Sequence, residues 1–316
     1  MSLTEDKIVV GIVVMIAAQF LLTGTDVSAK WLALAGVPAL QIAFIRYLVH
    51  FAISASYYLP RAGRVAFRSN NPGREIARSI CLIFITVFNF VALKFFPISV
   101  TTTISFATPL VVTILAIPLL DERVSVAQVG AVALGFLGVL VVVQPWGNSL
   151  HPAIFLSLCV LLCSSVYFLL TRSLAGTDSN ATMQLWSSGI ATVVLFPAAM
   201  AVWVWPNGIQ VWLILGAIGF FGGTGHTLVA TAHRFAKAST LAPVIYIQIF
   251  FATAAGAIVF SAMPTASTIL GAAIIVVSGA IGWRQMTFRL KAPHPAIETR
   301  RGLTNNGLKR DTDEDK

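Results

Sequence analysis

The strongest chemical signal in the chain is an arginine inside an apolar run. Residues 41–51 read QIAFIRYLVHF, so the fixed positive charge of Arg46 falls in a segment otherwise suited to lipid. A guanidinium keeps its proton and is costly at membrane depth, so the chain must either neutralise this charge or use it. Its planar fork of N–H donors matches a carboxylate or a phosphate. Arg46 is therefore a candidate for binding an anionic group of a substrate.

Asp26 offers Arg46 an internal partner. Asp26 lies near the end of the first apolar run, four residues before Lys30. Arg46 lies about 12 Å from Pro38 along the second run at 1.5 Å per residue, so antiparallel helices would place the two charges at similar depth. Two interpretations stay open. In one, Asp26 is part of a structural ion pair with Arg46 or Lys30; in the other, Asp26 holds Arg46 only until a substrate competes for it.

Other polar side chains interrupt the apolar runs and suggest the walls of a cavity. The run TTTIS at 101–105 precedes Pro109, Asn89 lies at comparable depth, and a later run carries Pro243. Hydroxyl groups can also satisfy carbonyls of their own helix, and a membrane histidine can be hydrogen-bonded packing. The candidates for substrate binding are Asp26, Arg46, Asn89, Thr102, Ser105, Tyr246 and Gln248. Asp26 and His226 are the candidates for proton coupling, because they titrate nearer neutrality than the others.

The residue types disfavour an enzyme, a metal protein and a channel. Ser164, Ser165, His50 and His226 are present, but no spacing places a nucleophile and a base on one helix face with an orienting group. The three cysteines lie in apolar runs without zinc spacing, so we expect no metal and no cofactor. No repeated ring of filter residues and no phosphate-binding G-x-x-x-x-G-K-[ST] loop occurs. Transport driven by ATP is therefore not expected either.

The composition indicates the elements that must position these residues. Of 316 residues, 57% are hydrophobic and only 10% are charged, and the mean hydropathy is +0.85. These values are typical of an integral membrane protein. Ten apolar stretches are long enough to span a bilayer. They cover residues 8–30, 38–59, 76–95, 98–120, 125–146, 152–173, 181–204, 209–234, 238–261 and 265–286.

The basic residues are sorted by side of the membrane. With ten spans, Lys30 and Lys94 fall on one side, whereas the N-terminal and C-terminal cations and the arginines of the loops fall on the other. The positive-inside rule then predicts a multi-pass membrane protein with both termini in the cytoplasm. The net charge of +9 is explained by this sorting, so we expect lipid and a small molecule as partners and no nucleic acid. Residues 287–316 are polar and are expected to form a disordered cytoplasmic tail.

A shift of 141 residues lays the second half of the chain on the first. Residues 128–139, QVGAVALGFLGV, then align with residues 269–280, ILGAAIIVVSGA, and Gly130 and Gly138 meet two glycines. The predicted fold is all-α, with five helices in residues 1–147 and five in residues 148–286. Because five is odd, the second copy is inverted, which is typical of secondary transporters that alternate access to a central site. The glycine-rich fifth and tenth spans are expected to serve packing, or a homodimer face.

Several stretches resemble a known family. They are TDVSAKWLAL at 25–34, the Arg46-Tyr47 pair, the segment from Thr101 to Val142, and APVIYIQIFFATAAG at 242–256. Together they resemble EamA-type ten-helix transporters of the drug/metabolite transporter superfamily over nearly the whole chain. This resemblance implies a secondary carrier of a small metabolite, such as an amino acid or a derivative. Within the superfamily, the spacing of Asp26, Lys30 and Arg46 is similar to that of S-adenosylmethionine uptake carriers, which gives a second candidate function.

Overall fold

The structure is a computed structural model that describes residues 5–120, 126–145, 151–174, 177–236, 241 and 244–291. Within these residues the regular structure is helical and contains no strand. The first half comprises α1 (Glu5–Leu34), α2 (Ala39–Ala62), the short 3-10 helix η1 (Gly63–Phe67), α3 (Pro72–Phe95), α4 (Ile98–Ser105), α5 (Thr108–Leu120) and α6 (Val126–Val143). The second half comprises α7 (Ile154–Leu174), α8 (Asn180–Ala201), α9 (Ile209–Phe235), α11 (Ile247–Phe260) and α12 (Ala266–Lys291).

The helices follow the apolar stretches of the sequence. Six of the described helices are long and apolar enough to cross a membrane, and four shorter apolar helices accompany them. The predicted fourth span is divided into α4 and α5 just before Pro109, which cannot donate the hydrogen bond that would continue the helix. The prediction of an all-α membrane protein is thus confirmed for the described residues, and the ten-span inverted repeat stays a prediction.

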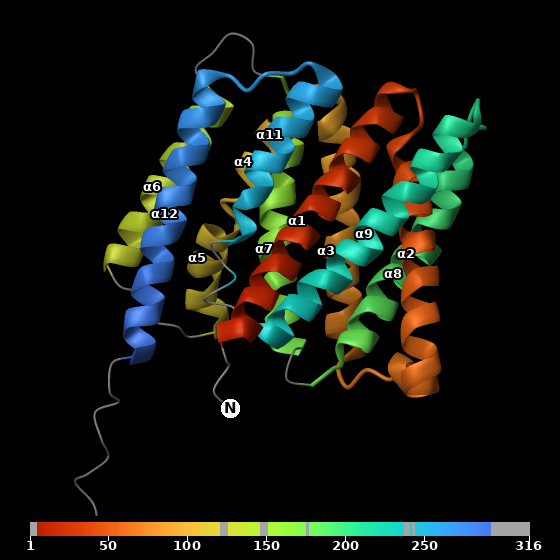
Figure 1. The fold of residues 1–316 in the computed structure, drawn as a ribbon, viewed down its shortest axis with the longest axis horizontal. Helices are drawn as coiled ribbons and strands as arrows, with labels where there is room; N and C mark the ends of the chain where they lie inside the picture. Colours follow the sequence, from red (N-terminus) through yellow and green to blue (C-terminus); the bar gives the residue numbers. More distant parts are fainter. Residues whose placement is uncertain are drawn as a thin grey trace, which may run out of the picture.

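The two largest hydrophobic clusters join most of the helices, and two smaller ones accompany them. One of the two contains mainly buried residues of α1, α2, α3, α8 and α9, such as Leu32 and Tyr47, together with Ile98 of α4 and Ala252 of α11. The other contains buried residues of α4 to α7 and α12, such as Leu110 and Ile275. In Figure 1, α1, α2, α3, α8 and α9 lie on one side of the molecule and α5, α6 and α12 on the other, with α4, α7 and α11 between them. The molecule therefore consists of two groups of helices that meet along a seam.

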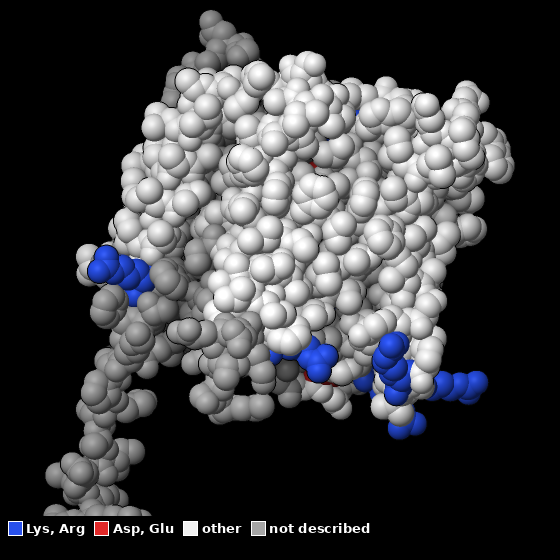
Figure 2. Space-filling model, in the orientation of Figure 1, with Lys and Arg blue, Asp and Glu red and all other residues white. Residues whose placement is uncertain are grey.

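Basic side chains gather at one end of the molecule. Figure 2 shows most of them at the end where α1 begins, and a further basic group lies higher up on the left edge of the same face. Arg61, Arg64, Arg68 and Arg74 are exposed on the connection from α2 to α3. This distribution agrees with the sorting of cations that the sequence predicts.

Glycine residues allow α6 and α12 to touch. A Cβ atom on Gly138 would lie 3.0 Å from the carbonyl oxygen of Gly271, and the hydroxyl of Ser278 donates to the carbonyl of Ala131 at 2.6 Å. Several glycines of the predicted homodimer face thus serve contacts within one chain, whereas a Cβ atom on Gly130 would have nothing within 4 Å. A homodimer through the outer faces of these helices stays a prediction.

The end of α12 differs from the boundary that the sequence suggested. The helix continues to Lys291, so residues 287–291 are helical although we expected the disordered tail to begin at residue 287. The rest of the predicted tail lies outside the described residues, as does Pro243.

Candidate functional site

Arg46 lies buried between α2, α3 and α9, with 5% of its surface exposed. Its Nη1 atom donates to Thr86 Oγ1 at 3.4 Å, and its Nη2 atom lies 3.3 Å from Nε2 of His226. The guanidinium also stands over the ring of Tyr47 at 4.6 Å. Because a guanidinium only donates, His226 must accept through Nε2 and carry its proton on Nδ1. The Nε atom of Arg46 is buried without a hydrogen-bond partner among the described residues.

Glycines of α9 make room for this guanidinium. A Cβ atom on Gly222 would lie 3.1 Å from Nε of Arg46, and one on Gly219 would lie 3.1 Å from the backbone oxygen of Arg46. A Cβ atom on Gly223 would meet the ring of His50 at 3.1 Å. The run GFFGGTG at 219–225 therefore lets α9 approach α2 closely enough to enclose Arg46.

Asp26 is not ion-paired with Arg46. Its Oδ1 atom accepts a hydrogen bond from Nδ2 of Asn89 at 3.0 Å, which joins α1 to α3. Within the described part of the chain the ion pair at 4.0 Å or less joins Arg78 and Glu75, and neither Asp26 nor Arg46 takes part in one. Lys30 does not pair with Asp26 either, because its ammonium donates to the carbonyls of Leu93 at 3.0 Å and Phe96 at 2.6 Å. Both ion pairs that the sequence suggested are thus absent from this conformation.

Two histidines lie next to Arg46. The ring of His50 stacks on that of His226, with centroids 5.9 Å apart and planes 5° from parallel. His50 is 1% exposed, and neither ring nitrogen has a hydrogen-bond partner among the described residues. Sequence reasoning named His50 only as a residue without a catalytic partner. The signal that could have found it is its position one helical turn after Arg46.

The candidates on α4 and α11 form a second group. The hydroxyls of Thr101, Thr103 and Ser105 each donate to a carbonyl of their own helix, at 3.1, 2.7 and 3.0 Å. These hydrogen bonds agree with the structural interpretation of the hydroxyl run, and substrate binding by Ser105 stays a prediction. Thr102 is buried, at 7% exposure.

On the other side of this group, the ring of Tyr246 lies 5.3 Å from that of Phe106, and its hydroxyl packs against Gly279. Gln248 is half-buried in the first turn of α11. Among the described residues no hydrogen bond joins this group to Arg46. The structure thus brings together Asp26 with Asn89 and Arg46 with His226, and it leaves Thr102, Ser105, Tyr246 and Gln248 apart from both.

Sequence reasoning missed a buried charge network around Arg78. Arg78 stands at the start of the third apolar stretch, where the sorting of cations predicts a residue at the cytoplasmic surface, but only 4% of its surface is exposed. The guanidinium is over the ring of Tyr167 and donates to Thr171 Oγ1 at 2.8 Å, to Ser187 Oγ at 2.6 Å and to the ion-paired carboxylate of Glu75 at 3.3 Å. Residues of α7 and α8 complete this shell, so the sequence around Arg78 could indicate only its pairing with Glu75, three residues earlier.

Asp178 joins two loops at the basic end. Its carboxylate accepts from Ser69 Oγ at 2.5 Å and from the backbone N–H of Asn70 at 2.9 Å. Burial raises the pKa of Asp178, but these hydrogen bonds together lower it by more, so the pKa lies below the ordinary value of a carboxyl. Asp178 therefore stays ionised at neutral pH, and its contribution to stability is lost only as the pH falls through this lowered pKa.

A helical protein with several helices long and apolar enough to cross a membrane, and with a buried cation enclosed between them, is a polytopic membrane protein. Residues 9–144 and residues 151–281 each match the EamA-like transporter family, and the chain belongs to this family. The resemblance inferred from the sequence is thereby confirmed.

Relatives of known function carry different cargo. The chain is 25% identical over 254 residues to the S-adenosylmethionine uptake transporter of Rickettsia prowazekii, covering 79% of this chain and 84% of that protein. It is 27% identical over 244 residues to the riboflavin transporter of Vibrio cholerae, covering 77% and 82%. A crystal structure of another protein superposes with a TM-score of 0.61 at 18% identity, over 92% of this chain and 100% of that chain, which shows a shared fold alone.

Proposed function

We propose that this chain is a secondary transporter of the bacterial inner membrane that carries a small metabolite with an anionic group. In this proposal residues 1–147 and 148–286 are inverted five-helix repeats, both termini are cytoplasmic, and the two groups of helices rock along their seam to alternate access. The family supports transport. The two larger hydrophobic clusters support rocking, because α4 is the one helix that contributes described buried residues to both, and groups of helices with largely separate cores can move relative to each other.

The observation that carries the proposal is the unpaired state of Arg46. A buried charge is costly unless it is paired, yet no carboxylate of the described residues lies within ion-pair distance of this guanidinium. Thr86 and His226 hold two of its nitrogen atoms, and Nε has no partner among the described residues. A carboxylate of an amino acid or of a derivative would supply the missing charge and accept from the open side of the fork.

In this proposal, protonation of His226 couples transport to a proton gradient. A second proton on the ring would remove the acceptor that Arg46 Nη2 uses, so protonation and release of Arg46 would be coupled. Asp26 is the other candidate, and its hydrogen bond from Asn89 places it on the adjoining helix pair.

S-adenosylmethionine is a second candidate cargo. Several relatives bear that function in their names, and the Rickettsia prowazekii protein matches over 84% of its length. The compound carries an α-carboxylate, whereas riboflavin carries neither a carboxylate nor a phosphate. The arginine therefore favours S-adenosylmethionine over riboflavin as a ligand.

A ligand screen on the purified protein tests the proposal. The melting temperature in detergent is measured with amino acids, S-adenosylmethionine and riboflavin, and compounds that stabilise the protein are tested for counterflow in proteoliposomes without ATP. A ligand at 100 times its Kd should stabilise the protein by about 2.7 kcal/mol. Arg46→Lys should fold but lose about tenfold in affinity for a carboxylate ligand, because an ammonium lacks the bidentate fork. Arg74→Lys, on an exposed arginine, is the matched control.

Unchanged affinity in Arg46→Lys would refute the role of Arg46. Binding of a carboxylate ligand without counterflow would refute transport of that compound.

A further inference from the structure

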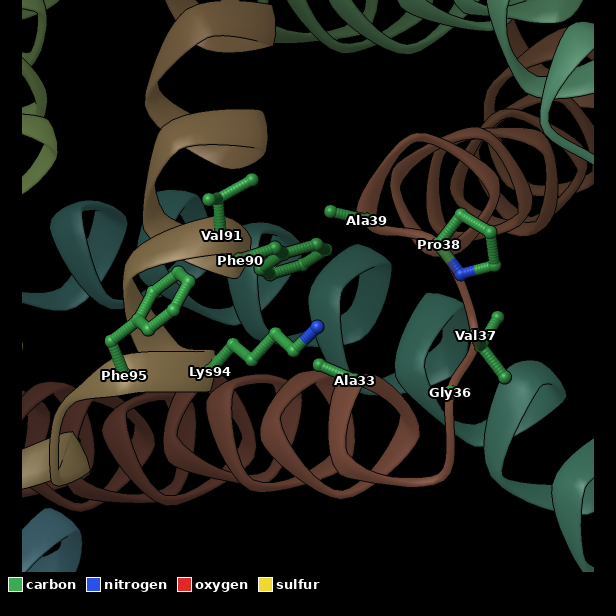
Figure 3. A pocket seen from close by; sticks show the side chains of 9 residues that line it. All are labelled: Ala33, Gly36, Val37, Pro38, Ala39, Phe90, Val91, Lys94 and Phe95. Atoms are coloured by element: carbon green, nitrogen blue, oxygen red, sulfur yellow. The ribbon is translucent and has the colours of Figure 1, made fainter. Parts of the chain in front are cut away.

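A cavity of about 380 Å³ opens where α1 turns into α2 and α3 ends. Its wall is mostly apolar, with Ala33, Val37, Phe90 and Phe95 among the lining residues. Figure 3 shows the side chain of Lys94 extending from α3 into this space, beside Phe90 and Ala33. The cavity thus combines an apolar wall with a cation.

The cation of this cavity is free to meet a solute. Of the two lysines that the sequence assigns to the outer side, Lys30 is held by two carbonyls at the end of α3. Lys94 is exposed, and the described part of the chain places no hydrogen-bond or ion-pair partner on its ammonium. The N-terminus of α2 also lies at this cavity, and no side chain caps it, so its first N–H groups add to the positive potential.

One face of α3 connects the cavity to the arginine site. Thr86, Phe90 and Lys94 follow at intervals of four residues, so they lie above one another along the helix. Thr86 accepts from Arg46 at 3.4 Å, and Lys94 lines the cavity about 12 Å further along the axis. Phe90 lies between them, 2% exposed and in the hydrophobic cluster of α1, α2, α3, α8 and α9.

We propose that this cavity is an outer vestibule in which Lys94 attracts the anionic group of a solute, and that Phe90 closes the path from the vestibule to Arg46. The inference rests on the proposed function, because it places an access site in front of the substrate site. Both the vestibule and the arginine site favour an anionic group. A solute therefore meets Lys94 at the surface first and reaches Arg46 only after Phe90 moves. Lys94 raises the rate at which an anionic solute associates, because an exposed charge attracts solutes from solution without fixing their orientation.

Thiol labelling tests the vestibule without knowledge of the cargo. In a background with Cys81, Cys159 and Cys163 replaced, Val91→Cys is treated on intact cells with an anionic and a cationic methanethiosulfonate, both impermeant. Val91 lines the cavity one helical turn before Lys94. A unit charge about 6 Å away in water changes each rate about threefold in opposite directions, so Lys94→Gln should lower the anionic-to-cationic rate ratio about tenfold.

Asn207→Cys, on the exposed turn before α9, is the matched control, and its ratio should not change with Lys94→Gln. Lys94→Arg should keep the ratio of the original protein at residue 91. An unchanged ratio at residue 91, or an equal change at residue 207, would overturn the anion-attracting vestibule.

A second labelling experiment tests the closing role of Phe90. Thr86→Cys should react slowly with the external anionic reagent while Phe90 is present and at least tenfold faster when it is combined with Phe90→Ala. Phe90→Leu, which keeps most of the bulk, should stay near the slow rate, and the melting temperature of each variant reports folding. Equal rates with and without the Phe90→Ala substitution in folded protein would overturn the closing role.

Neither labelling experiment requires transport. Failure of the cargo screen with successful labelling would therefore reject the proposed function alone, and the reverse result would reject the vestibule alone.

Discussion

Two arginines are buried among the described residues, and their surroundings give them different roles. Arg78 is bound by hydroxyls of α7 and α8 and by the carboxylate of Glu75, so its charge is neutralised within the chain. Arg46 has a hydroxyl, an imidazole and an aromatic ring around it and no carboxylate at ion-pair distance in the described part of the chain. We infer that Arg78 fixes helices together, whereas Arg46 is available to a ligand.

Substitution of Arg78 should therefore be far more damaging than substitution of its neighbour Arg74. Arg78→Gln leaves Glu75 buried without its partner, and loss of one member of a buried pair costs about 3 to 5 kcal/mol. Arg74 lies one helical turn earlier and is exposed, so Arg74→Gln should change stability by about 0.5 kcal/mol or less. Unfolding in detergent monitored by tryptophan fluorescence measures both. Equal stability of the two variants would contradict a structural role for Arg78.

The contrast also shows what could be predicted about single residues. Arg46 was found because a cation in the middle of an apolar run is unusual in any membrane protein. Arg78 was misplaced because it stands near one end of an apolar run, where exposed cations are common, and its partners other than Glu75 are about 90 to 110 residues away in sequence. The pairing of Asp26 with Asn89 instead of Arg46 depends on helix rotation, which periodicity in a wholly apolar helix does not fix.

At the level of helices, α9 is the element that fits α1 and α2 together. Glycines on one face of α9 allow the backbone of α2 to come close. Gly225 of α9 and Gly24 of α1 likewise allow α9 and α1 to come close. Small residues at helix contacts are typical of membrane proteins, where close packing replaces the hydrophobic effect between helices. The close contacts around Arg46 therefore depend on the absence of side chains at these positions.

Gly219→Ala should destabilise the protein, and Gly216→Ala should not. A Cβ atom on Gly219 would collide with Val49 and lie 3.1 Å from the backbone oxygen of Arg46, so α2 and α9 would have to separate. Overpacking of this kind costs about 1 to 3 kcal/mol. Gly216 is one turn earlier on the same helix, and a Cβ atom added there would have nothing within 4 Å, so alanine fits without strain. Melting temperatures in detergent compare the two, and a larger loss for Gly216→Ala would contradict this packing.

The ends of the helices were largely predictable. Pro38, Pro72 and Pro97 flank or open helices at the places where the apolar runs begin, and the break before Pro109 follows from its missing N–H. The extension of α12 to Lys291 was not predictable, because the residues after Met286 are mostly polar and show no helical pattern of apolar residues. Apolar composition predicts where a helix meets lipid, but a helix can continue into water.

For the whole molecule, the uneven distribution of basic side chains is the feature that sets orientation. They gather at the end where α1 begins, as Figure 2 shows, and the vestibule with Lys94 lies at the opposite end. Positively charged loops stay in the cytoplasm during insertion. We therefore expect the vestibule to face outward.

Single cysteines test this orientation. In the background without native cysteines, Asn207→Cys should react with an impermeant thiol reagent on intact cells, and Arg68→Cys should react only after the cells are opened. Both residues are exposed, so access to the reagent depends on the side of the membrane and not on burial. Reaction at residue 68 but not at residue 207 on intact cells would reverse the orientation.

The hydrogen bonds from Lys30 to the end of α3 fix one point about which the neighbouring helices can rotate. The Lys30 ammonium binds the carbonyls of Leu93 and Phe96, and Pro97 follows directly before α4. The start of α4 is thereby anchored to α1 at the end of the molecule that holds the vestibule. The helix α4 has 8 residues and is about 12 Å long at 1.5 Å per residue, and α5 follows it as a separate helix. A tilt of about 10° at this anchor moves the far end of α4 by about 2 Å and the near end hardly at all. The displacement caused by such a rotation therefore grows toward the basic end of the molecule.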